Sequence, residues 1–201
     1  MSKHRRARLL PHVALAVAAV LVVLLARRDL VRQREYTRLL RRAMNPHPGL
    51  FVPTFTARTL EGDTITLGHP GPGRAQLLFF FTTTCPYCRA SIPAVRRIAA
   101  AQVRGRVVAI SLDSLLATRA YAREHALHYP VVPLPERKLA DLYRVRRVPL
   151  VLVIGEGDEV VYARAGILEG PEAVDSVLEA LRNAVDDGPL RATGDAGAAR
   201  R

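Results

Sequence analysis

The sequence predicts a mixed α/β sheet with helices on both faces, preceded by an N-terminal β-hairpin and a single transmembrane helix. Two continuous apolar runs of strand length, residues 75–82 and 106–112, are typical of strands buried on both faces. A helical pattern separates them, so we expect the two strands to pair in parallel through a crossover helix. Residues 148–155 and 160–166 flank the turn "EGDE" and form an antiparallel hairpin. Parallel and antiparallel pairs together make the sheet mixed.

Residues 1–28 are predicted to be a membrane anchor. The apolar run from Leu9 to Ala26 lies between basic residues. About 18 residues of helix rise about 27 Å, close to the lower limit for crossing a bilayer. Arginines at both ends extend the usable length, because their side chains reach toward the interfaces. The run ends in "LLARRD", a poor signal-peptidase site, so we expect the anchor to be retained.

Residues 29–48 are predicted to form a basic juxtamembrane helix and a linker. Leu30, Val31, Leu39 and Leu40 lie among arginines over residues 29–44, which favours contact with anionic lipid headgroups; a solvated helical stalk is the alternative. Pro46 and Pro48 end this helix because proline cannot continue one. More basic residues follow the anchor than precede it, and this count by itself favours a cytoplasmic C-terminal domain.

Residues 49–185 contain the globular domain, and residues 186–201 are expected to be a disordered tail. The domain opens with a hairpin, because apolar and polar residues alternate around the turn "EGD". In the second of its helices we expect Leu116, Ala120 and Ala126 to face the core. The expected elements are a hairpin at 52–67, strands at 75–82, 106–112, 148–155 and 160–166, and helices at 86–102, 115–126, 136–143 and 171–185.

The chain is strongly basic, with a formal net charge of +12. Almost all of the excess is arginine, since lysine occurs only at Lys3 and Lys138. Such a charge attracts nucleic acid or anionic lipid. However, no basic segment is interleaved with aromatic residues, as a nucleic-acid groove requires. We therefore predict no nucleic-acid partner.

The chemistry of the chain centres on its two cysteines, Cys85 and Cys88. A zinc site needs four ligands, and His125 and His128 have no ligand-like neighbour that would complete one, so no metal or other cofactor is expected. A purely structural disulfide is a second alternative, but closing a loop of two intervening residues removes little chain entropy. A pair that cycles electrons is the third alternative.

The position of the cysteines favours the redox alternative. They follow a buried strand and lie in the first turn of a helix, where unpaired N–H groups and the helix dipole favour a thiolate. The outer residue, Cys85, is the expected nucleophile, and Cys88, one turn further in, resolves the mixed disulfide. Pro86 starts the helix and Tyr87 modulates exposure. A C-x-x-C motif that opens a helix after a strand is a thioredoxin-like signal.

The domain, from about Gly49 to Val185, resembles the thioredoxin superfamily and most of all its membrane-anchored TlpA/ResA-like branch. The segment "GLFVPTFTARTLEGDTITL" is similar to the N-terminal hairpin of that branch, with Pro53 and Phe55 at a Pro-x-Phe start. The C-x-x-C motif is followed by Pro93, at the family's helix proline. "VVAISLD" matches the strand after the first helix. "YRVRRVPLVLVIGEGDEVVYARAG" matches the family's segment with a proline before a strand.

The resemblance implies a redox-active disulfide between Cys85 and Cys88, faced by a cis bond before Pro149. An edge-strand proline is the alternative for that position. The resemblance further implies that the Val148 backbone pairs with an extended substrate segment. The predicted catalytic residues are therefore Cys85, Cys88 and Pro149, and their predicted neighbours in the active site are Thr84, Pro86, Tyr87 and Val148.

The sequence also departs from the family pattern. Thr84 replaces the aromatic residue usual before the first cysteine, and Phe79 stands where thioredoxin has a buried acid. Ser91 occupies the position of a helix acid in some ResA-like proteins. No family proton acceptor for the inner cysteine is therefore visible. Arginines near the motif stabilise a thiolate, or alternatively are simply solvated: Arg89, Arg146 and Arg147.

These features predict a thiol-disulfide oxidoreductase that acts on protein thiols outside the cytoplasm, for example in cytochrome c maturation. Its electron donor would be a membrane or soluble protein. The resemblance implies a single-pass protein of the cell inner membrane with its catalytic domain in the periplasm or extracytoplasmic space. One alternative is a thiol peroxidase, since Thr82 precedes Cys85 in a T-x-x-C pattern, although Leu78 replaces the expected proline. A copper metallochaperone is the other alternative.

Overall fold

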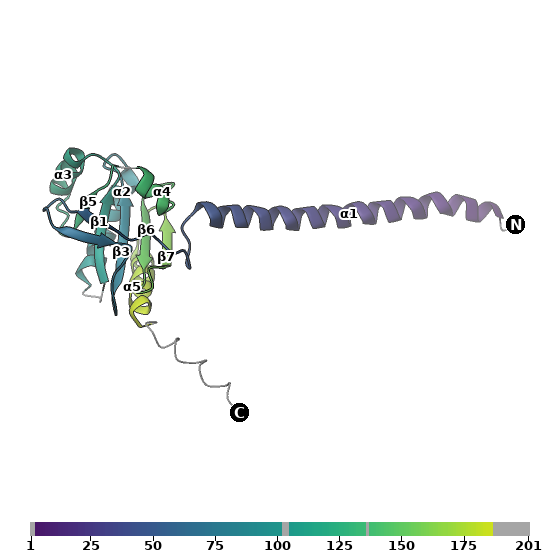
Figure 1. The fold of residues 1–201 in the computed structure, drawn as a ribbon. Coiled ribbons are helices and arrows are strands. Elements are labelled where there is room, and N and C mark those ends of the chain that lie inside the picture. The colour runs from purple at the N-terminus through teal and green to yellow at the C-terminus, as the bar shows by residue number, and fades with distance from the viewer. Residues whose placement is uncertain (1–2, 102–104, 136, 187–201) are drawn as a thin grey trace, which may run out of the picture. The chain divides into compact units, whose positions relative to one another are not determined.

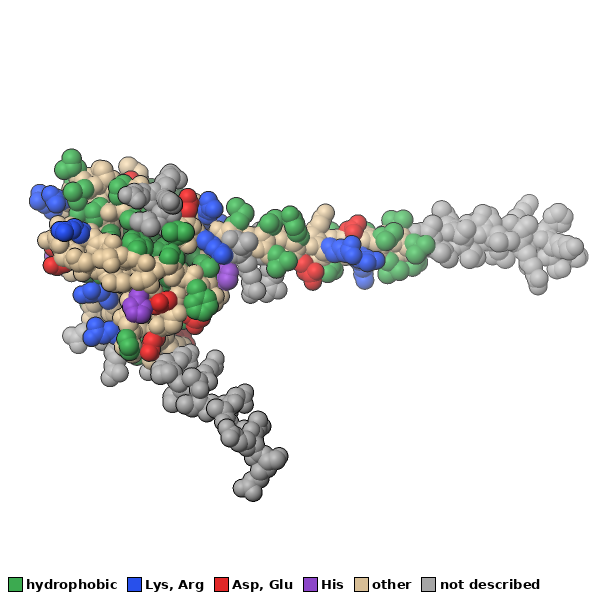
Figure 2. All heavy atoms as spheres, in the orientation of Figure 1, with side chains coloured by type: hydrophobic (Ala, Val, Ile, Leu, Met, Phe, Trp, Pro, Cys, Tyr) green, Lys and Arg blue, Asp and Glu red, His purple; other side chains and the backbone are tan. Residues whose placement is uncertain are grey.

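A computed structural model describes residues 3–101, 105–135 and 137–186, and it divides the chain into two units, Met1–Met44 and Asn45–Arg201. In the first unit, helix α1 runs from Lys3 to Met44. It ends just before Pro46, which has no N–H to continue the helical hydrogen bonds. Figure 2 shows charged side chains between apolar ones along the described part of this helix.

The side chains of residues 3–18 lie outside the described ones, and most of the predicted anchor is therefore not covered. Among the residues that were described, we found no helix with the length and apolar character needed to cross a bilayer. The membrane anchor stays a prediction.

The second unit is built around a five-stranded sheet with the strand order β5-β4-β3-β6-β7 (Figure 1). Strand β3 pairs in parallel with β4 and antiparallel with β6, while β4–β5 is parallel and β6–β7 antiparallel. The prediction of a mixed sheet is confirmed. The sheet strands are β3 (Ala75–Phe81), β4 (Gly105–Ser111), β5 (Val131–Pro133), β6 (Leu150–Ile154) and β7 (Val160–Ala165).

The predicted N-terminal hairpin forms a separate two-stranded sheet. Strands β1 (Phe55–Arg58) and β2 (Thr64–Leu67) pair antiparallel, with Phe55 opposite Leu67. Strand β5 at the sheet edge was missed by the sequence analysis. It spans three residues and ends in a proline, so it carries no readable periodicity, and a proline is tolerated at an edge strand.

The central strand β3 is buried along its whole length, and successive side chains point to opposite faces. Leu77, Phe79 and Phe81 belong to one core, which also contains apolar side chains of α2, α3 and α5. Leu78 and Phe80 belong to a second core under the β1–β2 hairpin and α4. The helices are α2 (Pro86–Ala100), α3 (Leu115–Glu124), α4 (Arg137–Leu142) and α5 (Pro171–Asp186).

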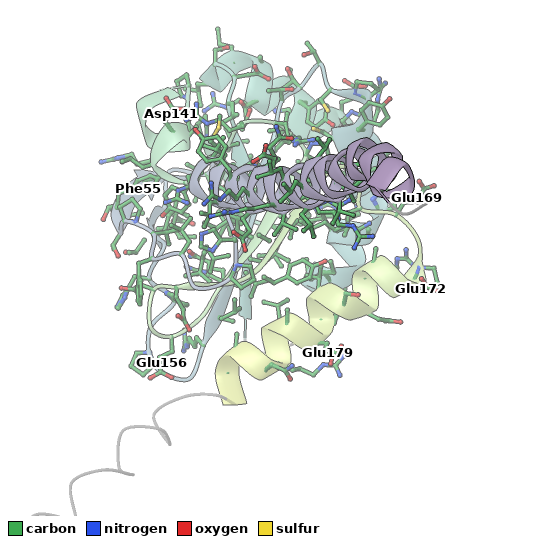
Figure 3. The ribbon with its side chains drawn as sticks, turned by 90° about the vertical axis from the view of Figure 1, so that its right-hand side faces the viewer. Phe55, Asp141, Glu156, Glu169, Glu172 and Glu179 are labelled. Atoms are coloured by element: carbon green, nitrogen blue, oxygen red, sulfur yellow. The ribbon has the colours of Figure 1, made fainter. Side chains whose placement is uncertain are left out.

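Helix α5 lies over the first core with its charged side away from the sheet. Ala173, Val174 and Val177 are buried on its inner side, whereas Glu172 and Glu179 point outward (Figure 3). The alternation of buried and exposed positions has the period of an α-helix.

The prediction of which side of α3 faces the core was wrong. Leu116 is 77% exposed and Ala120 and Ala126 are also exposed, while Thr118 and Tyr121 are buried. Two contacts with strands of the sheet turn this other side inward: Tyr121 packs on Phe81 of β3, and the Thr118 hydroxyl donates to the Ser111 hydroxyl oxygen of β4 at 2.7 Å. Buried hydrogen bonds and aromatic packing therefore outweigh the burial of one leucine at the start of the helix.

Candidate active site

The two cysteines lie where the central strand gives way to a helix. Strand β3 ends at Phe81, and helix α2 begins at Pro86. Cys85 is the N-cap residue of that helix, with φ −81° and ψ 113°. The proline at the first helical position removes an N–H that would have no intrahelical partner. The motif therefore places one sulfur at the helix end and the other one turn inside.

The Cys85 sulfur accepts the hydrogen bond that normally comes to an N-cap side chain. The backbone N–H of Cys88 donates to Cys85 Sγ at 3.2 Å. This hydrogen bond and the positive end of the helix dipole both stabilise negative charge on Sγ. Both cysteines are free thiols in this structure, with Cys85 partly exposed and Cys88 buried. Cys85 is thus the sulfur that another protein can reach.

Burial dominates the chemistry of the inner thiol. Cys88 is 0% exposed, and burial raises its pKa to about 12. A hydrogen bond with Cys85 and the charges of Cys85 and Asp113 raise this pKa further, whereas a backbone hydrogen bond from Thr82 lowers it. At neutral pH the reduced protein therefore holds Cys88 as a protonated thiol.

The predicted proline lies beside the outer sulfur. The Val148–Pro149 peptide bond is cis, as the resemblance implied, and Pro149 is buried. The Cys85 thiol donates to the Val148 carbonyl oxygen at a long distance of 3.9 Å. Strand β6 begins at Leu150 and pairs with β3, which ends four residues before Cys85. Adjacent strands thus bring the two segments together from positions about 60 residues apart in the chain.

The remaining predicted neighbours form the exposed edge of the site. Thr84, Pro86 and Tyr87 are exposed, and Tyr87 retains 63% of its surface. Val148 is partly buried and packs against both cores. Together with Cys85, these residues form what we call the outer rim of the site: Thr84, Cys85, Pro86, Tyr87 and Val148.

A carboxylate that the sequence analysis missed holds the loop before the motif. Asp113 Oδ2 accepts hydrogen bonds from the Thr83 backbone N–H at 2.6 Å and from the Thr83 hydroxyl at 2.8 Å. The backbone N–H of Asp113 in turn donates to the Ser111 hydroxyl oxygen at 3.3 Å. An available signal was that Asp113 follows the buried strand β4, parallel to β3, so both strands end at the same edge.

Two positions that carry acids in related proteins have a structural role here. Ser91 is fully buried, donates to the Tyr87 carbonyl at 2.8 Å and accepts from the Leu168 N–H at 2.9 Å. It therefore ties helix α2 to the segment before α5. Phe79 is buried and stacks on Phe81 with ring centroids 5.7 Å apart. Neither position supplies a proton acceptor.

The arginines near the motif are largely solvated. Arg89 and Arg147 are exposed. Arg146 forms an ion pair with Asp141, which Figure 3 labels, at 3.6 Å, and both side chains are more than half exposed. Because Asp141 compensates its charge, Arg146 contributes less to a thiolate than its position in the sequence suggested.

The two histidines considered as metal ligands, His125 and His128, lie at the C-terminal end of α3 and just after it. His125 packs edge-on against the ring of Tyr121, with centroids 4.2 Å apart, and His128 is exposed. Over the described ranges, no three His, Cys, Asp or Glu side chains are grouped in a way that could hold a metal ion.

The sequence is similar to a known family and to curated proteins. The model of the AhpC/TSA family matches residues 48–163, more than half of the chain. A methylamine utilization protein MauD from Methylobacillus flagellatus is 31% identical over 141 residues, which are 68% of this chain and 65% of that protein. The chain thus spans slightly less than two thirds of the length of this curated relative.

Solved structures show the same fold. The thioredoxin domain of a thiol-disulfide oxidoreductase from Bacteroides vulgatus is similar with a TM-score of 0.58 at 18% identity, over 67% of this chain and 98% of that one. StoA from Bacillus subtilis is similar with a TM-score of 0.55 at 20% identity, over 64% and 96% of the two chains. With its C-x-x-C motif at the start of α2, the chain belongs to the AhpC/TSA family and has the thioredoxin-like fold.

Proposed function

We propose that this protein is a thiol-disulfide oxidoreductase that exchanges the Cys85–Cys88 dithiol or disulfide with thiols of other proteins. One observation carries the proposal. A partly exposed sulfur caps a helix and accepts an N–H at 3.2 Å, and a fully buried second sulfur lies one turn behind it. An accessible nucleophile backed by an inaccessible thiol is suited to exchange in two steps.

In the first step, the Cys85 thiolate attacks one sulfur of a substrate disulfide. A Cys85–substrate disulfide forms, the substrate disulfide breaks, and the other substrate sulfur leaves as a thiolate. The Cys88 N–H stabilises the negative charge on Cys85 before the attack. In the second step, Cys88 attacks Cys85 Sγ, closes the internal disulfide and releases the reduced substrate.

The first step prepares the second. The reduced Cys85 raises the pKa of Cys88 both through their hydrogen bond and through its charge. Once Cys85 is bonded to a substrate sulfur it can carry no negative charge, so its charge no longer raises the pKa of Cys88. The pKa of Cys88 then falls at the stage when this sulfur must become a thiolate.

The substrate would lie along the start of strand β6. The Val148 carbonyl is 3.9 Å from Cys85 Sγ, so the backbone of this segment lies beside the nucleophile. An extended peptide whose cysteine is bonded to Cys85 would place its own backbone along this segment and add to it as a strand does. We propose protein disulfides, including those of apocytochrome c, as the substrates, and a membrane or soluble thiol protein as the electron donor.

We further propose that residues 1–28 anchor the protein in the inner membrane and that the catalytic domain works in the periplasm or extracytoplasmic space. The apolar run between basic flanks and the resemblance to a membrane-anchored branch support this location. The arginines of residues 29–48 would then lie near anionic lipid headgroups. A fusion of alkaline phosphatase after Arg201 is expected to be active, and an inactive fusion would contradict the orientation.

The function is tested with the purified full chain and its Cys88→Ser variant. The full chain is expected to reduce insulin disulfides with a dithiol as donor. Because Cys88→Ser keeps the accessible nucleophile and lacks the resolving thiol, it should accumulate mixed disulfides with proteins of its compartment. The matched control, Cys85→Ser, should accumulate none. Failure of both insulin reduction and mixed-disulfide formation would falsify the proposed exchange.

A thiol peroxidase is the second candidate function. The match to the AhpC/TSA family and the similarity to a peroxiredoxin-like protein from Aquifex aeolicus, with a TM-score of 0.55, favour it. The T-x-x-C spacing is also present, and the Thr82 carbonyl accepts a hydrogen bond from the Cys85 N–H at 3.3 Å. Consumption of hydrogen peroxide at a rate above that of insulin reduction would establish this candidate instead.

A further inference from the structure

Tyr121, in helix α3, is a buried side chain to which the exchange reaction as described assigns no role. It is 6% exposed. Its ring packs on Phe81 with centroids 5.4 Å apart and on His125 with centroids 4.2 Å apart. Phe81 is the last residue of β3, from which the loop to the C-x-x-C motif departs. Two ring contacts therefore fix the phenol beneath the active-site end of the sheet.

The hydroxyl of Tyr121 is buried and has no hydrogen-bond partner within the described part of the chain. Buried tyrosine hydroxyls normally have a partner, because an unsatisfied polar group in an apolar core is unfavourable. Removing this hydroxyl would remove that penalty. The hydroxyl is therefore available to a partner that forms in another state of the protein.

One residue of the active site lies in the same core as this phenol. Cys88 belongs to the same buried core as Tyr121. Burial chiefly raises the pKa of Tyr121 to about 12; Cys88 makes the largest charge contribution to this rise, ahead of Cys85 and Glu124, while Arg89 lowers the pKa. The phenol therefore keeps its proton at neutral pH, and a hydroxyl is a hydrogen-bond donor in that form.

We propose that the Tyr121 hydroxyl donates a hydrogen bond to Cys88 Sγ when this sulfur becomes a thiolate, and so accelerates the second step of exchange. The inference rests on the proposed exchange function. In the reduced protein Cys88 is a neutral thiol, and the phenol makes no hydrogen bond to it. In the mixed disulfide the charge on Cys88 turns the phenol into a charge-assisted donor.

The chemistry of the step is unchanged by this contact. Cys88 loses its proton, and its sulfur attacks Cys85 Sγ. The bond between the two cysteine sulfurs forms, the bond from Cys85 to the substrate sulfur breaks, and the substrate leaves as a thiolate that takes up a proton. Tyr121 keeps its own proton throughout and lowers the energy of the attacking thiolate.

A coloured aromatic disulfide, dithiobis(nitrobenzoate), separates the two steps in a stopped-flow experiment on the full chain. Attack by Cys85 releases the first nitrothiobenzoate in a phase that depends on reagent concentration. Attack by Cys88 releases the second in a phase that does not. Tyr121→Phe is expected to slow the second phase roughly tenfold, as for the loss of a hydrogen bond to a charged group, and to leave the first unchanged.

Tyr129→Phe is the matched control. Tyr129 is equally buried and its hydroxyl is also unpartnered, but neither cysteine contributes to its pKa, which burial raises. This variant should keep both phases. A second phase that is unchanged in Tyr121→Phe, or equally slow in Tyr129→Phe, would overturn the inference. If the wild type shows neither phase, the proposed exchange function itself fails.

A second variant tests the donor without removing it. Fluorotyrosine at position 121 keeps the ring and makes the phenol a stronger donor, so the second phase should become faster, and no acceleration would contradict the role. The thermal midpoint of Tyr121→Phe should be at or above that of the wild type, because an unsatisfied hydroxyl is removed. A large loss of stability in step with the rate would instead indicate a purely structural role.

Discussion

The outer rim of the site and the core beneath it place the two sulfurs of one motif in opposite surroundings. Cys85 is partly exposed, caps a helix and accepts an N–H at 3.2 Å. Cys88 is three residues further on and 0% exposed, and burial raises its pKa to about 12. The position of each sulfur relative to the helix end, and not its residue type, therefore assigns the roles of nucleophile and resolving thiol.

The largest effect is expected from replacing one cysteine at a time. Cys85→Ser should abolish the release of both nitrothiobenzoate groups, because the remaining thiol is buried and protonated. Cys88→Ser should release only the first. The readout is the amount released by the folded protein and, as a control, after denaturation, when Cys88 becomes reactive. Rapid reaction of folded Cys85→Ser would contradict the assignment of roles.

The second prediction concerns stability at high pH. In the unfolded chain Cys88 loses its proton above its ordinary pKa of 9.0, whereas the folded protein keeps it up to about 12. The unfolded state therefore binds fewer protons in this window, and the free energy of unfolding falls as pH rises. Within this window the thiol lowers the free energy of unfolding by roughly 1.4 kcal/mol for each pH unit. Burial also raises the pKa of Tyr121, Tyr129 and Tyr143, which adds to the fall.

Denaturant unfolding from pH 8 to pH 11 isolates the cysteine contribution. Cys88→Ala should show a shallower decrease than the wild type, because only the tyrosines remain. Cys85→Ala is the matched control and should keep most of the slope, since burial is the main cause of the raised Cys88 pKa. Equal slopes in wild type and Cys88→Ala would show that the inner thiol is not held protonated by the fold.

The third prediction uses Asp113, which binds the loop before the motif and also affects the buried thiol. Its carboxylate holds Thr83 through two hydrogen bonds, and its charge raises the pKa of Cys88. Asp113→Asn keeps an acceptor oxygen but removes the charge, so the second release phase should become faster at fixed pH. Asp113→Ala also loses both hydrogen bonds and should reduce stability by about 1–3 kcal/mol. A slower second phase in Asp113→Asn would point to a carboxylate that accepts the Cys88 proton.

The fourth prediction separates stability from chemistry in the inner region. Ser91 is fully buried and its hydroxyl accepts the Leu168 N–H at 2.9 Å. Ser91→Ala leaves that N–H without a partner and should lower the free energy of unfolding by about 1–2 kcal/mol. Both release phases should keep their rates, because this hydroxyl points to the α5 side and not to a sulfur. A change in either phase would assign Ser91 a part in the reaction.

The outer rim was more predictable from sequence than the inner region. An apolar run, a C-x-x-C pair and a proline at the first helical position fix the strand end and the N-cap locally, so Cys85 and Pro86 were placed correctly. The surroundings of Cys88 depend on contacts between distant segments. Asp113 reaches Thr83 from the next strand. Tyr121 faces inward because it packs on Phe81, although Leu116 is more apolar. Local pattern contains neither contact.

The smallest effect is expected at an exposed ion pair near the rim. Arg146 lies 3.6 Å from Asp141, and their side chains are 55% and 58% exposed. Solvent and salt screen such a pair, so Arg146→Gln should change stability by less than about 1 kcal/mol. The first release phase should slow only slightly, and the difference should vanish in high salt. Asp141 already compensates the charge of the arginine. A large, salt-dependent decrease in the rate of the first phase would therefore mean that Arg146 leaves Asp141 to stabilise the Cys85 thiolate. The outer sulfur would then depend on side-chain charge as well as on the helix end.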